Sequence, residues 1–153
     1  MTINFNIVLI EPEIPQNTGN IVRLCACSNS ELYLVGKLGF SLSNKYTKRA
    51  GLDYWGSVNI HKYETIEDLI AEKQGHNFYF LTTKTTQKYT DIQFKQGDFL
   101  VFGPETRGID ENILERYKEN NLTIPMAKGQ RSLNLSNSVA IVLYEGIRQN
   151  GTL

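Results

Sequence analysis

The segment Arg131-Ser132-Leu133-Asn134-Leu135-Ser136-Asn137 precedes the apolar run Val139-Ala140-Ile141-Val142-Leu143-Tyr144, and these two segments decide how the end of the chain folds. The apolar run predicts a buried helix over about 135–149. Ser and Asn side chains can accept hydrogen bonds from the free N–H groups of a helix start, and Ser136 or Asn134 is placed to do so. Two Asn and two Ser exceed the needs of one cap. The surplus indicates a polar ligand at the start of this helix.

The rest of the chain alternates between strand-like and helix-like segments. Apolar and β-branched runs predict strands at 5–10, 32–35, 58–61, 78–81, 99–102 and 122–124. Helices are expected at about 19–28 with Asn17 or Thr18 as cap, at 65–73 with Thr65 as cap, and from Asp110 to about 118. Strands this apolar need cover on both sides. The pattern therefore predicts an α/β fold with a mostly parallel sheet and helices on both faces.

Length and composition narrow the class of protein. The chain has 153 residues, which is one domain's worth and enough for a proper core. Lys plus Arg and Asp plus Glu number 16 each, so any RNA partner must be met by local patches. Candidates for such a patch are Lys45, Lys48 and Arg49, which are expected on a short helix within the irregular segment 36–56.

Cysteine and histidine usage argues against metal chemistry. Cys25 and Cys27 point about 200° apart on a helix, which predicts two reduced cysteines that pack rather than bind. His61 and His76 have no partner at ligand spacing, so no metal site is expected. No apolar run approaches the roughly 18 residues of a membrane span, and no signal segment opens the chain. We therefore expect a cytoplasmic protein without a membrane partner.

Ligands of parallel sheets collect at the carboxyl ends of strands. Three chemically unusual loops follow strands here, at 82–86, 103–108 and 126–137. The loop from Gly103 to Gly108 has the glycine spacing of a phosphate loop but lacks its lysine, and Glu105 would repel phosphate. A positively charged ligand fits better. The first strand is followed by Glu-Pro-Glu-Ile-Pro, which lacks the three glycines of a dinucleotide fingerprint.

Three segments carry a resemblance to a known family. They are Pro12-x-Ile14-Pro15-x-Asn17-Thr18-Gly19-Asn20-x-x-Arg23, Phe102-Gly103-Pro104-Glu105-x-x-Gly108 and Ser132-Leu133-Asn134-Leu135-Ser136-Asn137. In this order and spacing they resemble the signature motifs of the SPOUT superfamily of RNA methyltransferases. The chain is most similar to the small single-domain tRNA 2′-O-methyltransferases that modify the wobble nucleotide of leucine tRNAs. The resemblance extends over the single domain 1–153, including Arg49-Ala50-Gly51-Leu52-Asp53-Tyr54 and Leu81-Thr82-Thr83-Lys84.

The resemblance implies a fold, a cofactor and partners. The SPOUT fold ends in a deep trefoil knot, and S-adenosyl-L-methionine lies bent in that knot, held largely by backbone groups. The proteins are homodimers that reach tRNA across the dimer interface. The implied cofactor-binding positions are Leu81, Gly103, Glu105, Gly108, Ile124, Ser132 and Leu133. The three apolar ones would equally serve the core, and the two glycines would equally serve a turn. Glu105 would attract the sulfonium cation or accept hydrogen bonds from backbone N–H groups.

The residues implied on the catalytic and RNA side are Arg23 and Asn17. An arginine stays protonated and is a poor base, so we expect Arg23 to anchor a phosphate and to stabilise developing negative charge. A base role assisted by phosphate, and a plain surface arginine, stay open. Asn17 either caps the first helix or faces the substrate ribose. Asn137 either caps the last helix or touches RNA, and Tyr144 is either buried or reaches RNA with its hydroxyl.

The remaining candidates for phosphate contact are the basic residues Lys45, Lys48, Arg49, Lys128 and Arg131, each of which is also explained as a solvated charge. The expected function is S-adenosyl-L-methionine-dependent 2′-O-methylation of the wobble nucleotide, a cytidine or modified uridine, of leucine tRNAs. Alternatives are the same reaction on another RNA such as ribosomal RNA, or a noncatalytic RNA-binding protein on the same fold. A nucleotide hydrolase is weakened by the missing phosphate-loop lysine.

Overall fold

The computed structural model of the chain describes residues 3–43, 45, 49 and 52–153. Within this part, six parallel strands form one sheet in the order β3-β2-β1-β5-β4-β6. Their bounds are Asn6–Ile10 (β1), Glu31–Val35 (β2), Ile60–Tyr63 (β3), Phe78–Leu81 (β4), Phe99–Phe102 (β5) and Asn121–Leu122 (β6). The predicted α/β class with a parallel sheet is confirmed. Strands β1 and β5 meet at its centre, where the direction of strand addition reverses.

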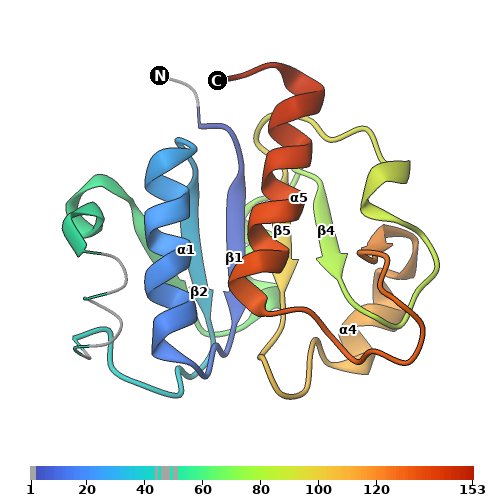
Figure 1. Cartoon of the computed structure of the whole chain (residues 1–153), viewed down its shortest axis with the longest axis horizontal. Coiled ribbons are helices and arrows are strands. Elements are labelled where there is room, and N and C mark those ends of the chain that lie inside the picture. Colours follow the sequence, from blue (N-terminus) through green and yellow to red (C-terminus); the bar gives the residue numbers. More distant parts are fainter. Residues whose placement is uncertain (1–2, 44, 46–48, 50–51) are drawn as a thin grey trace.

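Helices cover both faces of the sheet. Helices α1 (Pro15–Cys27) and α5 (Leu135–Asn150) lie side by side on one face (Figure 1). Helices α3 (Ile66–Glu72) and α4 (Glu111–Arg116) contribute to the core on the other face. Short 3₁₀ helices lie at Leu52–Ser57 (η1), Tyr89–Asp91 (η2) and Lys118–Asn120 (η3).

Strand β1 shows why the central strands are almost entirely apolar. Ile7 and Leu9 belong to the core beneath α1 and α5, whereas Val8 belongs to the core of the opposite face. All three side chains are at most 1% exposed. Because successive side chains of a strand point to opposite faces, a strand covered on both sides needs apolar residues at every position.

Three helix starts follow the predicted capping. The side-chain oxygens of Thr65, Asp110 and Asn134 each accept a hydrogen bond from a backbone N–H of the first turn, at 3.1, 2.8 and 3.2 Å. These residues are the N-caps of α3, α4 and α5. The caps predicted at Thr65 and Asp110 are therefore confirmed, and so is Asn134, one of three candidates for the last helix together with Ser136 and Asn137.

The start of α1 contradicts the prediction. The helix begins at Pro15 rather than near Gly19, and its N-cap residue Ile14 makes no side-chain capping bond. Asn17 and Thr18 lie inside the helix, so neither of them caps it. A proline suits the first helical position because its fixed φ is already helical and it has no N–H group to satisfy. The backbone N–H groups of Glu13 and Ile14, just before the helix, donate to the side chain of Glu105 in a distant loop.

Other element boundaries also differ. Strand β3 lies at 60–63 rather than 58–61, and α4 ends at Arg116, where the 3₁₀ helix η3 replaces its predicted last turn. The last strand ends at Leu122 instead of Ile124. The reason is a change of partner: the Thr123 N–H donates to the Gln87 carbonyl at 2.7 Å, and the Thr123 carbonyl accepts from the Tyr89 N–H at 3.0 Å.

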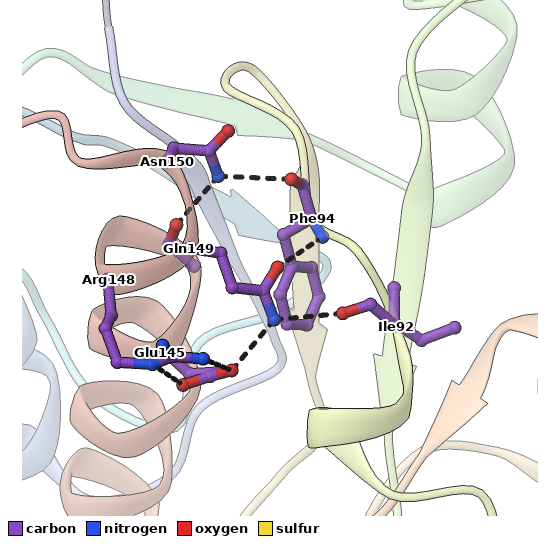
Figure 2. A network of polar contacts seen from close by, with 7 residues as sticks. Ile92, Phe94, Glu145, Arg148, Gln149 and Asn150 are labelled. Atoms are coloured by element: carbon purple, nitrogen blue, oxygen red, sulfur yellow. Dashed lines mark hydrogen bonds and ion pairs between the residues drawn. The ribbon is translucent and has the colours of Figure 1, made fainter.

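The C-terminal end of α5 is fastened to the segment before β5 (Figure 2). Gln149 accepts a hydrogen bond from the Phe94 N–H at 2.7 Å and donates one to the Ile92 carbonyl at 2.9 Å. Asn150 donates to the Phe94 carbonyl at 3.1 Å. Gly146 lets the helix approach the core closely, because a Cβ there would lie 2.6 Å from the ring of Phe5.

Three smaller predictions can be compared with the structure. Cys25 is buried as expected, whereas Cys27 is exposed and does not pack. Lys48 lies outside the described residues. In the part of the chain that is described, no helix is long and apolar enough to cross a membrane, and no group of three or more His, Cys, Asp or Glu side chains is placed to hold a metal ion.

Candidate active site

A cavity of about 530 Å³ opens at the carboxyl ends of β4 and β5. The start of α1, the loops 81–84 and 102–109, and residues 123–138 before and within α5 supply its walls. The three loops that were chemically unusual in the sequence therefore meet at one place. The volume lies in the range of roughly 300–1,000 Å³ that is usual for small-molecule sites.

The cavity brings together every residue that the resemblance assigned to the cofactor. They are Leu81, Gly103, Glu105, Gly108, Ile124, Ser132 and Leu133. Leu81 and Ile124 are half-buried and also pack against the core beneath α1 and α5, so the two interpretations of these residues are compatible. Leu133 is 40% exposed, which rules out a purely core role.

The loop after β5 is a tight turn built on two glycines. Gly108 has a φ of +69°, in the region that favours glycine, and its N–H donates to the Pro104 carbonyl at 2.9 Å. A Cβ on Gly103 would lie 2.4 Å from the carbonyl carbon of Gly108 and from the backbone nitrogen of Ile109. Both glycines are therefore needed by the turn itself. The same turn leaves bare backbone at the wall of the cavity.

Glu105 holds the segment that leads into α1. Its carboxylate accepts hydrogen bonds from the backbone N–H groups of Glu13 and Ile14 at 2.8 and 2.9 Å. The amide of Asn17 donates to the same carboxylate at 3.2 Å. Of the two roles open for Glu105, the contacts favour the acceptor of backbone N–H groups. They fix the backbone that leads into α1, whose N-cap residue Ile14 makes no side-chain capping bond.

A second carboxylate makes the contact between the two loops reciprocal. Glu13 accepts hydrogen bonds from the N–H and the hydroxyl of Thr106, at 2.9 and 2.8 Å. The backbone hydrogen bond from Thr106 is the main reason why the pKa of the Glu13 carboxyl lies below its ordinary value. Arg107 pairs with Glu11 at 3.1 Å. We call this set of contacts between residues 11–14 and 105–107 the loop clasp.

Asn17 connects the loop clasp to α5. Its side-chain oxygen accepts a hydrogen bond from the amide of Asn134 at 3.2 Å, while its own amide donates to Glu105. The Asn17 side chain thus uses both ends of its amide, and the residue is only 5% exposed. Glu105, Asn17 and Asn134 form a relay of side chains, one from each of the three motifs. In this arrangement Asn17 serves to position these motifs.

Of the residues expected on the catalytic and RNA side, Asn17 and Arg131 line this cavity, and the other described ones lie outside it. Arg131 lines the cavity and is exposed. Arg23 is exposed on α1, six residues beyond Asn17 and therefore about 9 Å further along the helix axis. Its guanidinium carbon lies over the ring of Tyr54, 5.3 Å from the ring centroid.

Further candidates are spread over the surface. Tyr144 is 40% exposed on α5, so the burial that an apolar helix predicts is wrong for this residue within one chain. Asn137 is exposed, and its backbone N–H rather than its side chain takes part in capping. Lys45 and Arg49 are exposed as well. The structure does not bring these residues together with Arg131 at the cavity of the same chain.

Sequence reasoning missed several residues of the site. Thr82, Thr83 and Lys84 line the cavity, although the sequence marked them only as part of a polar loop and of the resemblance. The role of Glu13 in the loop clasp had no local signal, because its partner Thr106 lies 93 residues away. The spacing of residues in a motif cannot reveal such a pair, since strands β1 and β5 bring the two loops together only in the folded sheet.

Comparisons with known proteins agree with one another. The model of the SpoU rRNA Methylase family matches residues 4–144. The tRNA (cytidine(34)-2'-O)-methyltransferase of Methylovorus glucosotrophus is 50% identical over 147 residues, which cover 95% of this chain and 96% of that protein. A structure solved for the 2-OH methylation of C/U34 on tRNA has a TM-score of 0.92 at 37% identity and covers 97% of both chains. The AdoMet-bound rRNA methyltransferase of Sinorhizobium meliloti shares the fold, with a TM-score of 0.86 at 24% identity, and this chain covers 58% of it.

Proposed function

The chain belongs to the SpoU rRNA Methylase family, and from this premise we propose that it methylates the ribose 2′-hydroxyl of nucleotide 34 in tRNA. The observation that carries the proposal is the meeting of three separate motifs around one cavity, tied together by the relay of Glu105, Asn17 and Asn134. A relative that is half identical over nearly its whole length is named for this reaction on cytidine 34. The whole chain, 1–153, acts as one domain in this proposal.

The cavity suits S-adenosyl-L-methionine by size and by lining. Leu81, Ile124 and Leu133 offer apolar surface for a flat base, and Thr82 and Ser132 offer hydroxyl groups. The two glycines of the 103–108 loop add bare backbone. When bound, the cofactor supplies an electrophilic methyl group. The protein's own part is to hold the loops in place, and the loop clasp does this without the cofactor.

We propose that Arg23 meets the cavity of a second copy of the chain. The exposed residues of α1 recur at positions 16, 20, 23 and 27, and those of α5 recur at 137, 141, 144 and 148. The two stripes lie on neighbouring helices, and the α5 stripe includes the exposed apolar residues Ile141 and Tyr144. Such a surface favours a homodimer in which α1 and α5 pack against the partner. In it, Arg23 of one chain would serve RNA at the cavity of the other.

The path of the chain near β6 supports the knot. Leu122 accepts a hydrogen bond from the Thr82 N–H at 2.9 Å, and Thr123 is paired with residues 87 and 89. Residues 122–123 therefore lie between the end of β4 on one side and residues 87–89 on the other. The segment 82–89, which connects these two, runs around residues 122–123. The chain then returns to the centre of the molecule, where α5 packs on α1. We propose that this path is the deep trefoil knot.

In the reaction that we propose, Arg23 binds a phosphate next to the target ribose. Its permanent positive charge stabilises the negative charge that develops on the attacking 2′-oxygen. We further propose that the substrates are leucine tRNAs with cytidine or modified uridine at the wobble position, which implies the cytoplasm as compartment. Ribosomal RNA is the competing substrate, because the family carries its name.

Ribose-methylation mapping of total tRNA tests the function. RNA from cells without the protein is compared with RNA from cells that carry the wild type or the Arg23→Ala variant. We expect methylation at position 34 of leucine tRNAs to disappear without the protein and to return only with the wild type. Unchanged tRNA together with a lost mark on ribosomal RNA would transfer the reaction to that substrate. Restoration by Arg23→Ala would remove Arg23 from the mechanism.

A further inference from the structure

Arg23 is held differently from the arginines that form ion pairs in this protein. Arg107, Arg116 and Arg148 each pair with a carboxylate, at 3.1, 3.3 and 2.8 Å. In the part of the chain that the structure describes, the guanidinium of Arg23 makes no ion pair or hydrogen bond. Its contact is the face of an aromatic ring, that of Tyr54, at 5.3 Å from the centroid.

The ring under Arg23 is itself fixed by the core. Tyr54 belongs to η1, which packs against α1. Tyr54 and its neighbour Trp55 are half-buried and pack against the core beneath α1 and α5. The ring is therefore a fixed platform rather than a loose surface side chain.

A ring and a carboxylate fix a guanidinium with opposite consequences for its charge. A carboxylate neutralises the cation and occupies the N–H groups that a phosphate would need. An aromatic face attracts the cation through its quadrupole and leaves the net charge in place. The guanidinium carries five N–H donors, and those that do not point at the ring stay free for the two oxygens of a phosphate.

We propose that Tyr54 is a positioning residue for RNA binding: it orients Arg23 without neutralising it, so that the guanidinium is ready for a phosphate of the substrate. The inference rests on the proposed function of Arg23. It also gives a role to Tyr54 of the Arg49–Tyr54 motif, whose described residues do not line the cavity. The Tyr54 hydroxyl has no part in this, so a phenylalanine at position 54 should serve equally well.

The first test is independent of RNA. The ring current of Tyr54 should move the Arg23 Hε resonance upfield in the NMR spectrum of the intact protein. Tyr54→Phe should preserve that shift, and Tyr54→Leu should abolish it. Tyr54→Met fills similar space without a ring and replaces the leucine variant if that one fails to fold. An Arg23 Hε resonance that is the same in the wild type and in the ring-free variant would overturn the proposal.

The second test is a double-mutant cycle on tRNA affinity. Removing the ring should weaken tRNA binding about three- to fivefold, as expected for a cation–π contact at an exposed site. Tyr54→Phe should stay within about twofold of the wild type on the same basis. In an Arg23→Ala background, removing the ring should cost nothing more. A loss of equal size in both backgrounds would show that Tyr54 acts on RNA without Arg23, and would overturn the proposal.

The matched control for the loss of the Tyr54 ring is the loss of another aromatic ring, that of Tyr117. Tyr117→Leu removes a ring that stacks on Phe80 in the core of the opposite face, and it should leave tRNA affinity unchanged. An equal loss from Tyr117→Leu would overturn the proposal, because it would make the effect of Tyr54 a general one.

If Arg23→Ala alone leaves tRNA binding intact, the phosphate role of Arg23 in the proposed function fails. In that case the platform proposal for RNA fails with it, while the NMR shift still reports whether Tyr54 orients Arg23.

Discussion

The two ends of α5 are held by the same chemistry for different purposes. At the start, Asn134 donates to Asn17, which donates to Glu105. At the end, Gln149 and Asn150 bond to the backbone of residues 92–94 (Figure 2). Side-chain amides take part in both sets, and both sets join segments that are far apart in the sequence. Only the first set borders the cavity.

The difference between the ends lies in what their side chains hold. Gln149 and Asn150 satisfy N–H and carbonyl groups of residues 92–94, a stretch outside the strands of the sheet. Glu105 instead holds the loop that forms one wall of the cavity. A polar network alone therefore does not identify a site. A polar network indicates a functional site only where it fixes residues that a ligand would contact.

The largest effect is expected from Gln149→Leu. This variant leaves the Phe94 N–H without an acceptor and the Ile92 carbonyl without a donor, both partly buried. The free energy of unfolding should fall by about 2–3 kcal/mol, from two lost hydrogen bonds with unsatisfied groups left behind. Urea unfolding measures this at one fixed protein concentration. Cofactor affinity should not change.

Gln74→Leu is the matched control, since Gln74 is exposed after α3. Its unfolding free energy should stay within about 0.5 kcal/mol of the wild type. If Gln149→Leu weakened cofactor binding as much as it weakens the fold, the two ends of α5 would not be separate in function, and the comparison would break.

Glu105→Gln should give the reverse pattern. A glutamine has one acceptor oxygen where the carboxylate has two, so its NH₂ group must face either the Glu13 N–H or the donors of Ile14 and Asn17. We expect cofactor affinity to fall about tenfold, which corresponds to about 1.4 kcal/mol. The free energy of unfolding should fall less than in Gln149→Leu, because Ile14 is exposed and water can replace the lost acceptor.

Isothermal titration with S-adenosyl-L-methionine measures this affinity, and Glu115→Gln on the exposed surface of α4 is the control. Full affinity in Glu105→Gln would contradict a role of the loop clasp in cofactor binding.

The two ends also show how far a sequence can be interpreted. Asn134 could be predicted as a cap because its partner is three residues away. The start of α1 could not be predicted, since Glu105 lies 91 residues beyond Ile14 and reaches it only when β1 and β5 pair. The positions expected to bind the cofactor came from the resemblance, and the structure places them at one cavity. The loop clasp, with its Glu13–Thr106 pair, has no sequence pattern of its own.

Asn134→Asp separates capping from the relay. The aspartate keeps an oxygen for the N–H at the start of α5, so unfolding should change by less than about 0.5 kcal/mol. It loses the donor to Asn17 and sets a negative charge against that oxygen at 3.2 Å. We expect kcat/KM to fall about fivefold, the equivalent of one hydrogen bond of about 1 kcal/mol. Asn134→Ala should lose stability as well as activity, because it also removes the capping oxygen. Full activity of Asn134→Asp would show that the relay of Glu105, Asn17 and Asn134 is not needed for catalysis.

The smallest effect concerns pH and involves two carboxylates, Glu145 near the C-terminal end of α5 and Glu13 in the loop clasp. Glu145 accepts hydrogen bonds from Arg148 at 2.8 and 3.0 Å and from Gln149 at 2.8 Å. The Arg148 guanidinium is the main reason why the pKa of the Glu145 carboxyl is below its ordinary value of 4.5. A lowered pKa in the folded state stabilises the fold at pH values above 4.5, and this contribution is lost as the pH falls through the folded pKa.

Glu145→Gln should therefore unfold more easily than the wild type at neutral pH, by a few tenths to about 1 kcal/mol, and the gap should close in acid. Glu13 has a pKa lowered in the same direction, by its hydrogen bonds from Thr106. Because this lowered pKa is also that of the folded state, Glu13→Gln should show the same closing gap in the free energy of unfolding. Because Glu13 belongs to the loop clasp, this variant should in addition bind the cofactor less tightly, which Glu145→Gln should not. If Glu13→Gln changed unfolding alone, the loop clasp would be held for stability just as the C-terminal end of α5 is, and the distinction between the two regions would disappear.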